Sequence, residues 1–361
     1  MDVVIPVQIV EAALWLCGGT VVLLLLLLVL VRARRMSGDR RTARRLAPLA
    51  DDLLEVVCGE DPDGAASARL AAVPHRHRRT LERAIVARLE FVRGAPAREL
   101  TDVLQSWGVR DRWVSRTRSL SPRRRAAAVS DLGFLGGDGV GDVLRARLGD
   151  RNDGVRSSAA HAIGRIRDVD GAALVLESVA PGPRGNVPLW VAMEGVCFPG
   201  ASAGTMSALS HDSSVVRAAA ARAVALGGWL GAAPAVRAAM ADESDTHALV
   251  EQVRALAVVG SGADSTTLLD ATRPAQAGAV RSAAVLALAE LGGGVQPFMT
   301  LLSDPDDDVA RAAVVALTRL GPTGRRALID VEDPSPPVAQ EVALAALSAA
   351  GRRLALQQGA T

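Results

Sequence analysis

The sequence contains no lysine and no tyrosine, and only 2% of its 361 residues are aromatic. Without lysine the chain cannot form a Schiff base or a phosphate-binding loop of the G-x-x-x-x-G-K-[ST] type, and without tyrosine it has no phenolic nucleophile. All 41 basic residues are therefore arginines, a bias typical of a GC-rich bacterial genome. These absences alone disfavour several classes of enzyme.

Cysteine is also scarce, with three residues, Cys17, Cys58 and Cys197. No two of them have the spacing of a metal site or a redox motif, so we expect inert thiols in a reducing compartment. The 49% hydrophobic fraction excludes disorder and a small disulfide scaffold. With so few aromatic rings, the core must consist of Ala, Val and Leu.

The net charge is low, at +2, but the charges are unevenly distributed. Residues 32–125 contain 22 Arg and 12 acidic residues, whereas residues 126–361 contain 19 Arg and 25 acidic residues. A basic segment therefore precedes an acidic body. Nucleic acid is not expected as a partner, because no aromatic residues alternate with the arginines and the body is acidic.

Residues 12–31 form an uncharged, apolar run near the start of the chain. A helix of this length spans roughly 30 Å, the thickness of one bilayer core. The run ends in Leu23 to Leu28 and Val31, and arginines follow it instead of a cleavage site. This pattern favours a retained transmembrane helix over a cleaved signal peptide or a buried core helix. We therefore expect a single-pass protein of the inner membrane.

Seven arginines directly after this run predict its orientation. By the positive-inside rule, the following chain is cytoplasmic, residues 1–11 lie outside, and Trp15 lies near the outer interface. The same arginines could also attract anionic lipid headgroups, an alternative that remains open beside a role in topology alone. The cluster consists of Arg32, Arg34, Arg35, Arg40, Arg41, Arg44 and Arg45.

The rest of the chain contains an internal repeat of about 30 residues. In the copy that starts at Val155, apolar residues occupy offsets 0, 4, 5, 7, 8 and 11, which lie on one face of an α-helix. A glycine and a second, less regular apolar stretch follow each copy. We therefore predict an all-α fold, an α-solenoid of about eight helical hairpins. The copies start at residues 124, 155, 187, 216, 248, 280, 309 and 338.

Charged residues recur at fixed places in this repeat. Acidic residues precede the first helix of most copies, where they can cap free N–H groups and complement the helix dipole. An arginine occupies the second position of four copies. The acidic residues include Asp150, Asp212, Asp304 and Asp333, and the arginines are Arg125, Arg156, Arg217 and Arg281.

The string V-R-x-x-A-A-x-A-[LIV]-x-x-[LI]-G resembles the HEAT-like repeats of the phycobilisome-lyase type over residues 120–350. The resemblance implies that the acidic residue before a helix and the arginine at its second position form a ladder along the stack. Four copies have Pro188, Leu249, Ala310 and Ala339 in place of that arginine, so a continuous ladder is not expected. Such repeats occur in scaffolds, in chromophore lyases and in occasional enzymes.

No catalytic, cofactor-binding or metal-binding cluster is apparent in the sequence. Deoxyhypusine-hydroxylase-type HEAT proteins bind iron through His-Glu dipeptides, and this chain has none. His161 falls at a solvent-facing offset of its copy, while His75 and His77 lie among arginines that disfavour a metal ion. We therefore expect neither a cofactor nor a small-molecule substrate.

These patterns predict the domain order and a function. Three helices are expected over residues 46–57, 80–91 and 97–107, before the repeats begin. We expect a membrane-anchored scaffold that is not an enzyme and that binds a partner protein, such as a membrane enzyme or transport system, through its second helices. A lyase- or hydroxylase-like enzyme remains the alternative, by analogy of fold alone. The expected segments are 1–11 outside, 12–31 transmembrane, 32–119 basic collar and helical cap, 120–352 solenoid and 353–361 tail.

Overall fold

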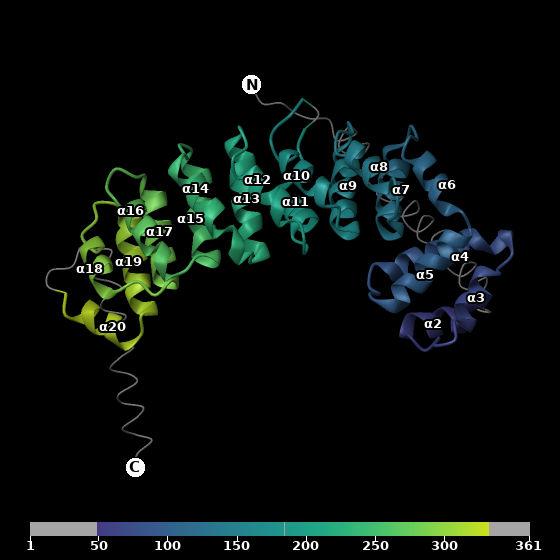
Figure 1. Ribbon diagram of the computed structural model, residues 1–361, viewed down its shortest axis with the longest axis horizontal. Coiled ribbons are helices and arrows are strands. Elements are labelled where there is room, and N and C mark those ends of the chain that lie inside the picture. Colours follow the sequence, from purple (N-terminus) through teal and green to yellow (C-terminus); the bar gives the residue numbers. More distant parts are fainter. Residues whose placement is uncertain (1–48, 184, 332–361) are drawn as a thin grey trace, which may run out of the picture. The chain divides into compact units, whose positions relative to one another are not determined.

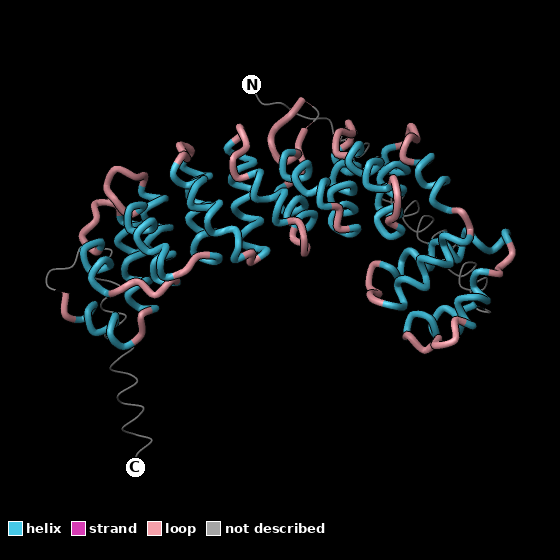
Figure 2. The backbone as a smooth tube through the Cα atoms, in the orientation of Figure 1, coloured by secondary structure: helices cyan, strands magenta, loops and turns pink. Residues whose placement is uncertain are grey.

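The computed structural model describes residues 49–183 and 185–331, and Figure 1 shows the order of their helices. Every regular element in these two ranges is a helix, and none is a strand (Figure 2). The chain divides into two compact units, Met1–Asp111 and Arg112–Thr361. The helix α6, Val109–Arg116, carries the chain from the first unit into the second.

The first unit is a small bundle in which α5 packs against the three helices before it. Its core is aliphatic, with Leu81, Ile85 and Leu100 fully buried. The indole N–H of Trp107 donates to the carbonyl of Ala71 at 2.9 Å and so joins the end of α5 to α3. The helices are α2 Ala50–Cys58, α3 Ala65–Ala71, α4 His75–Leu89 and α5 Ala95–Ser106.

The second unit contains seven helical hairpins within the described residues. Each consists of a first helix, a short turn and a second helix, with the one-turn 3-10 helices η2 Leu230–Ala232 and η3 Gly262–Asp264 before two of the second helices. The hairpins are α7 Pro122–Leu135 with α8 Val140–Arg147, α9 Asp153–Ile166 with α10 Val169–Glu177, α11 Leu189–Val196 with α12 Ser202–Ala208, α13 Ser214–Gly227 with α14 Ala233–Ala241, α15 Thr246–Val259 with α16 Ser265–Ala271, α17 Gly278–Glu290 with α18 Val295–Leu301, and α19 Asp307–Arg319 with α20 Pro322–Ile329.

The first helices form a continuous row, because each packs against the first helix of the next hairpin. The repeat's apolar offsets make this contact: in α9, Val155, Ala159, Ala160 and Ile163 are all fully buried. Small alanines at these offsets let neighbouring helices pack closely without aromatic rings. The predicted α-solenoid of HEAT-like hairpins is confirmed for the described residues. The eighth copy, predicted from residue 338, lies outside them.

Glycines inside the first helices bring α7, α9 and α11 especially close together. A Cβ atom on Gly133 would lie 2.7 Å from the Cβ of Ala162, and one on Gly195 would lie 2.7 Å from the carbonyl oxygen of Ala160. A Cβ atom on Gly164 would similarly lie 2.8 Å from the carbonyl oxygen of Glu194. Glycine is therefore required in these helices by packing, not by a turn.

The expected localisation as a single-pass inner-membrane protein is contradicted. The longest helix in the described part of the chain, α4, has 15 residues and is rich in arginine. None of the described helices is both long and apolar enough to cross a bilayer. The residues on which that expectation rested, namely 12–31 with Trp15 and the cluster Arg32 to Arg45, lie outside the described residues.

Candidate functional site

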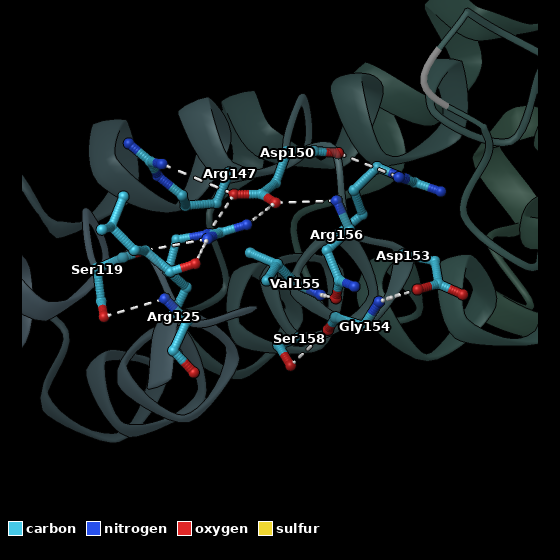
Figure 3. Close-up of polar contacts among 12 residues, drawn as sticks. Ser119, Arg125, Arg147, Asp150, Asp153, Gly154, Val155, Arg156 and Ser158 are labelled. Carbon is cyan, nitrogen blue, oxygen red and sulfur yellow. Dashed lines mark hydrogen bonds and ion pairs between the residues drawn. The ribbon is translucent and has the colours of Figure 1, made fainter. Parts of the chain in front are cut away.

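Three arginines at the second position of the repeat join neighbouring hairpins through ion pairs. The Nε and Nη2 atoms of Arg125 donate to the two carboxylate oxygens of Asp150 at 2.9 and 2.8 Å (Figure 3). Arg217 binds Glu243 in the same two-point way at 2.7 Å, and Arg281 Nη2 donates to Asp304 at 2.6 Å. Each pair links the first helix of one hairpin to the loop that precedes the next.

The acidic partners in these three pairs share one position relative to the repeat. Asp150, Glu243 and Asp304 all lie five residues before the start of the next repeat copy. Asp212 lies four residues before its copy, but the preceding copy has Pro188 in place of the arginine, and the backbone carbonyl of Asp212 accepts a hydrogen bond from Arg217 of the following helix. The sequence analysis did not single out Glu243, although its offset could have identified it. Asp333 lies outside the described residues.

Arg156 has no carboxylate partner in the described part of the chain. Gly182 occupies the offset where the other pairs have an acid. The guanidinium is 5% exposed and donates to the backbone carbonyls of Asp150 at 3.0 Å and Asn186 at 3.1 Å. The ladder of arginine and acid is thus interrupted between the second and third hairpins.

The second helices carry a further set of links that the sequence analysis did not anticipate. Arg145 in α8 donates to both carboxylate oxygens of Asp168, which precedes α10, at 2.6 and 2.8 Å. Arg237 Nη1 in α14 donates to one carboxylate oxygen of Asp264, which precedes α16. Both rows of helices are therefore held by ion pairs between neighbouring hairpins.

The arginine partners of Asp150 and Glu243 favour the ionised form of these two carboxyls. Burial acts to raise the pKa of Asp150, but the hydrogen bonds from Arg125 and from the amide of Asn152 outweigh it, and the pKa is lowered. Burial also acts to raise the pKa of Glu243, but hydrogen bonds, first among them those from Arg217, outweigh it, and this pKa is lowered as well. The pairs are therefore charged links that should weaken in acid.

The solvent-facing side of α9 and α11 carries an exposed cluster around Trp190. The indole ring is 64% exposed, and its centroid lies 6.0 Å from that of the His161 ring. His161 Nδ1 lies 3.0 Å from a carboxylate oxygen of Glu194, one helical turn from Trp190. His161 was expected to face solvent, and it is partly exposed beside these two residues.

A second aromatic contact lies on the neighbouring pair of first helices. The guanidinium of Arg165 in α9 lies 3.9 Å from the ring centroid of Phe134 in α7, close enough for a cation–π interaction. Arg165 Nη1 also donates to the carbonyl of Ser130 in α7 at 3.2 Å. Together with the Trp190 cluster, this contact makes an exposed surface across α7, α9 and α11.

No metal centre is present among residues 49–183 and 185–331. These ranges contain no group of three or more His, Cys, Asp or Glu side chains that could hold a metal ion. Cys58 and Cys197 are free, exposed thiols.

The comparisons identify similar folds at low sequence identity. No protein-family model and no curated protein matches the chain. Among solved structures it is similar to the CpcE–CpcF complex of phycocyanin lyase from Nostoc sp. PCC7120, with 17% identity, a TM-score of 0.31, and coverage of 65% of this chain and 94% of that one. It is also similar to Kap121p bound to Pho4p, with 12% identity, a TM-score of 0.47, and coverage of 82% of this chain and 41% of that one. A third similar structure is human deoxyhypusine hydroxylase, with 16% identity, a TM-score of 0.30, and coverage of 78% of this chain and 98% of that one.

Proposed function

We propose that this chain is a non-catalytic, protein-binding α-solenoid and that its partner contacts the exposed surface of α7, α9 and α11. The observation that carries the proposal is the exposed Trp190. The sequence contains only nine aromatic residues, four Phe and five Trp, and most of those in the second unit's described part are at least half-buried. A tryptophan exposed to solvent beside His161 and Glu194 is unusual in such a chain.

Tryptophan and arginine are enriched among the residues that contribute most to binding at protein interfaces. Trp190 and Arg165 lie on helices whose backbones are in glycine-mediated contact, so the surface needs little ordering when a partner binds. Leu226 on α13, the next first helix along the row, is also exposed. The proposal places the contacts on first helices and differs here from the expectation that second helices bind the partner.

The test compares partner recovery by matched variants of the full-length protein. Trp190→Ala removes the exposed ring, whereas Phe91→Ala removes an even more exposed ring from the first unit. Each tagged variant is produced in its native host, and the co-purified proteins are quantified by mass spectrometry. We expect Trp190→Ala to reduce recovery of a specific partner by roughly tenfold or more, and Phe91→Ala to leave it unchanged.

Circular dichroism shows whether both variants keep the helical fold of the wild type. Equal partner recovery by wild type, Trp190→Ala and Phe91→Ala would refute the proposed surface. A second variant, Arg165→Gln with Leu226→Ser, tests the same surface without touching Trp190. If it also leaves recovery unchanged, no part of the surface contributes to binding.

A further inference from the structure

A hollow of about 490 Å³ lies where the loop before α7 meets the loop before α9. Its lining includes four arginines and one acidic residue: Arg118, Arg125, Arg147, Arg151 and Asp150. The region in Figure 3 shows Arg125 and Arg147 directed at the Asp150 carboxylate. This hollow shares no residue with the surface around Trp190, so it is a separate feature of the second unit.

The hollow carries an excess of positive charge. Asp150 accepts two hydrogen bonds from Arg125, and Arg147 Nη1 lies 3.8 Å from it. The exposed side chains of Arg118 and Arg151 have no ion-pair partner among the described residues. Residues 112–125 contain six arginines and no acidic residue, so the adjoining chain supplies no carboxylate to neutralise them.

One of these guanidinium groups is fixed in place before any ligand arrives. Besides its two bonds to Asp150, Arg125 donates through Nη1 to the carbonyls of Ser119 at 3.0 Å and Leu120 at 3.2 Å. Arginine's planar fork matches a carboxylate or phosphate group. The unpaired Arg118 and Arg151 are then available to an incoming anion beside a rigid, positively charged wall.

The rim of the hollow favours a peptide as the source of that anion. The side chain of Leu120 lines the hollow and is 99% exposed, which offers an apolar contact that an amino-acid side chain can use. No aromatic ring lines the hollow, so it lacks the aromatic platform on which single-stranded nucleic-acid binders stack bases. The six-charge acidic excess of residues 126–361 would also repel a long polyanion extending beyond the first hairpins.

We propose that the arginine-lined hollow between the α6–α7 and α8–α9 loops binds a short acidic protein segment through its carboxylates. The hollow accepts two or three carboxylates near Arg118 and Arg151, and Leu120 contacts an apolar residue of the same segment. The proposal does not depend on the surface around Trp190, and either site can fail while the other stands.

The test measures binding of a fluorescein-labelled peptide of six glutamates and one leucine to the full-length protein by fluorescence anisotropy. The variant Arg118→Gln with Arg151→Gln removes the two unpaired charges without touching an internal contact. The control, Arg273→Gln with Arg311→Gln, removes two exposed arginines far along the chain. We expect the hollow variant to weaken binding about fivefold or more, and the control to change it less than twofold.

Further arms distinguish the peptide from other anions. A peptide with glutamine in place of glutamate should not bind, and Leu120→Ser should weaken binding of the glutamate peptide. Equal weakening by the hollow variant and the control would overturn the proposal, because it would show non-specific attraction. The proposal would also be overturned if inorganic phosphate or a short single-stranded DNA, at matched charge, displaced the labelled peptide as effectively as unlabelled peptide does.

Discussion

Replacing Glu243 with glutamine should loosen the contact between α13 and α15. The Glu243 side chain is fully buried, and its two oxygens accept five hydrogen bonds. Oε1 accepts from Arg217 Nη2 and from the amides of Ser244 and Asp245, while Oε2 accepts from Arg217 Nε and Gln252 Nε2. Glutamine keeps the shape but has only one acceptor oxygen, so its amide must face two donors.

The magnitude follows from which donors lose their acceptor. If the new amide replaces Oε2, Arg217 Nε and Gln252 Nε2 are affected. Gln252 can turn its side chain, because its own Oε1 has no partner in the described structure. The loss that remains is a hydrogen bond from a charged group, which costs about 2–3 kcal/mol when its partner is removed.

Amide hydrogen exchange measures this loss locally. A solenoid can open one hairpin at a time, so a global unfolding midpoint averages over regions that the substitution does not touch. At pH 7 the amides of α15 and its preceding loop should exchange about 30- to 150-fold faster in Glu243→Gln than in the wild type. Amides in α7 should be unaffected, because α7 lies several hairpins away.

The isosteric control is Asp270→Asn. Asp270 pairs with Arg273, but both side chains are more than half exposed, so the change should be below about 0.5 kcal/mol. Equal exchange rates in Glu243→Gln and Asp270→Asn would refute the reasoning. So would a difference between Glu243→Gln and wild type that does not shrink as the pH falls below about 4.3, the ordinary pKa of a glutamate carboxyl.

Three further predictions concern acid, packing and the first unit. The folded-state pKa values of Asp150 and Glu243 are lowered, so the two ionised carboxylates contribute fully to stability above about pH 5. This contribution is lost as the pH falls through the folded-state pKa values, which thermal unfolding measured against pH checks. Gly195→Ala should destabilise the second unit by about 1–3 kcal/mol, measured by urea unfolding. Trp107→Phe should cost about 1–2 kcal/mol, because it leaves the carbonyl of Ala71 without its indole donor.

Each of these predictions has a control or a contrary outcome. Gly231→Ala is the packing control, since a Cβ atom there meets nothing within 4 Å, and an equal loss in both glycine variants would contradict the close-packing argument. Stability that does not change between pH 6 and pH 3 would contradict charged links between hairpins. Trp107→Phe should leave amide hydrogen exchange in α15 unchanged, because Trp107 belongs to the first unit and α15 to the second.

The repeat was predictable from the sequence because the residues at its apolar offsets are the ones buried between neighbouring helices. Offsets 0, 4 and 5 place Val155, Ala159 and Ala160 on one helix face, and all three are fully buried. In the first unit, the helices expected over residues 46–57, 80–91 and 97–107 correspond to α2, α4 and α5, whereas α3 was not predicted. A seven-residue helix without a clear apolar period gives little sequence signal.

The links between hairpins were only partly predictable, because they depend on two copies at once. Arg217 was identified from its place in one copy, but its partner Glu243 belongs to the loop before the next. In three places a carboxylate five residues before a copy reaches the arginine of the preceding copy, whereas the copy preceding Asp212 has Pro188 in place of that arginine. The exposure of Trp190 was not predictable, because the third copy departs most from the repeat pattern.

That departure connects the broken ladder to the proposed binding surface. The loop before α11 has Gly182 where an acid would pair with Arg156, and α11 itself has only 8 residues. Arg156 donates instead to the carbonyl of Asn186 in that loop, and Gly195 lets α11 pack closely against Ala160 of α9. Positions that depart from the repeat pattern while the fold is kept are positions where function, instead of packing, can determine the residue. The exposed Trp190 lies on that same irregular helix, so the irregularity and the candidate binding surface have one physical origin.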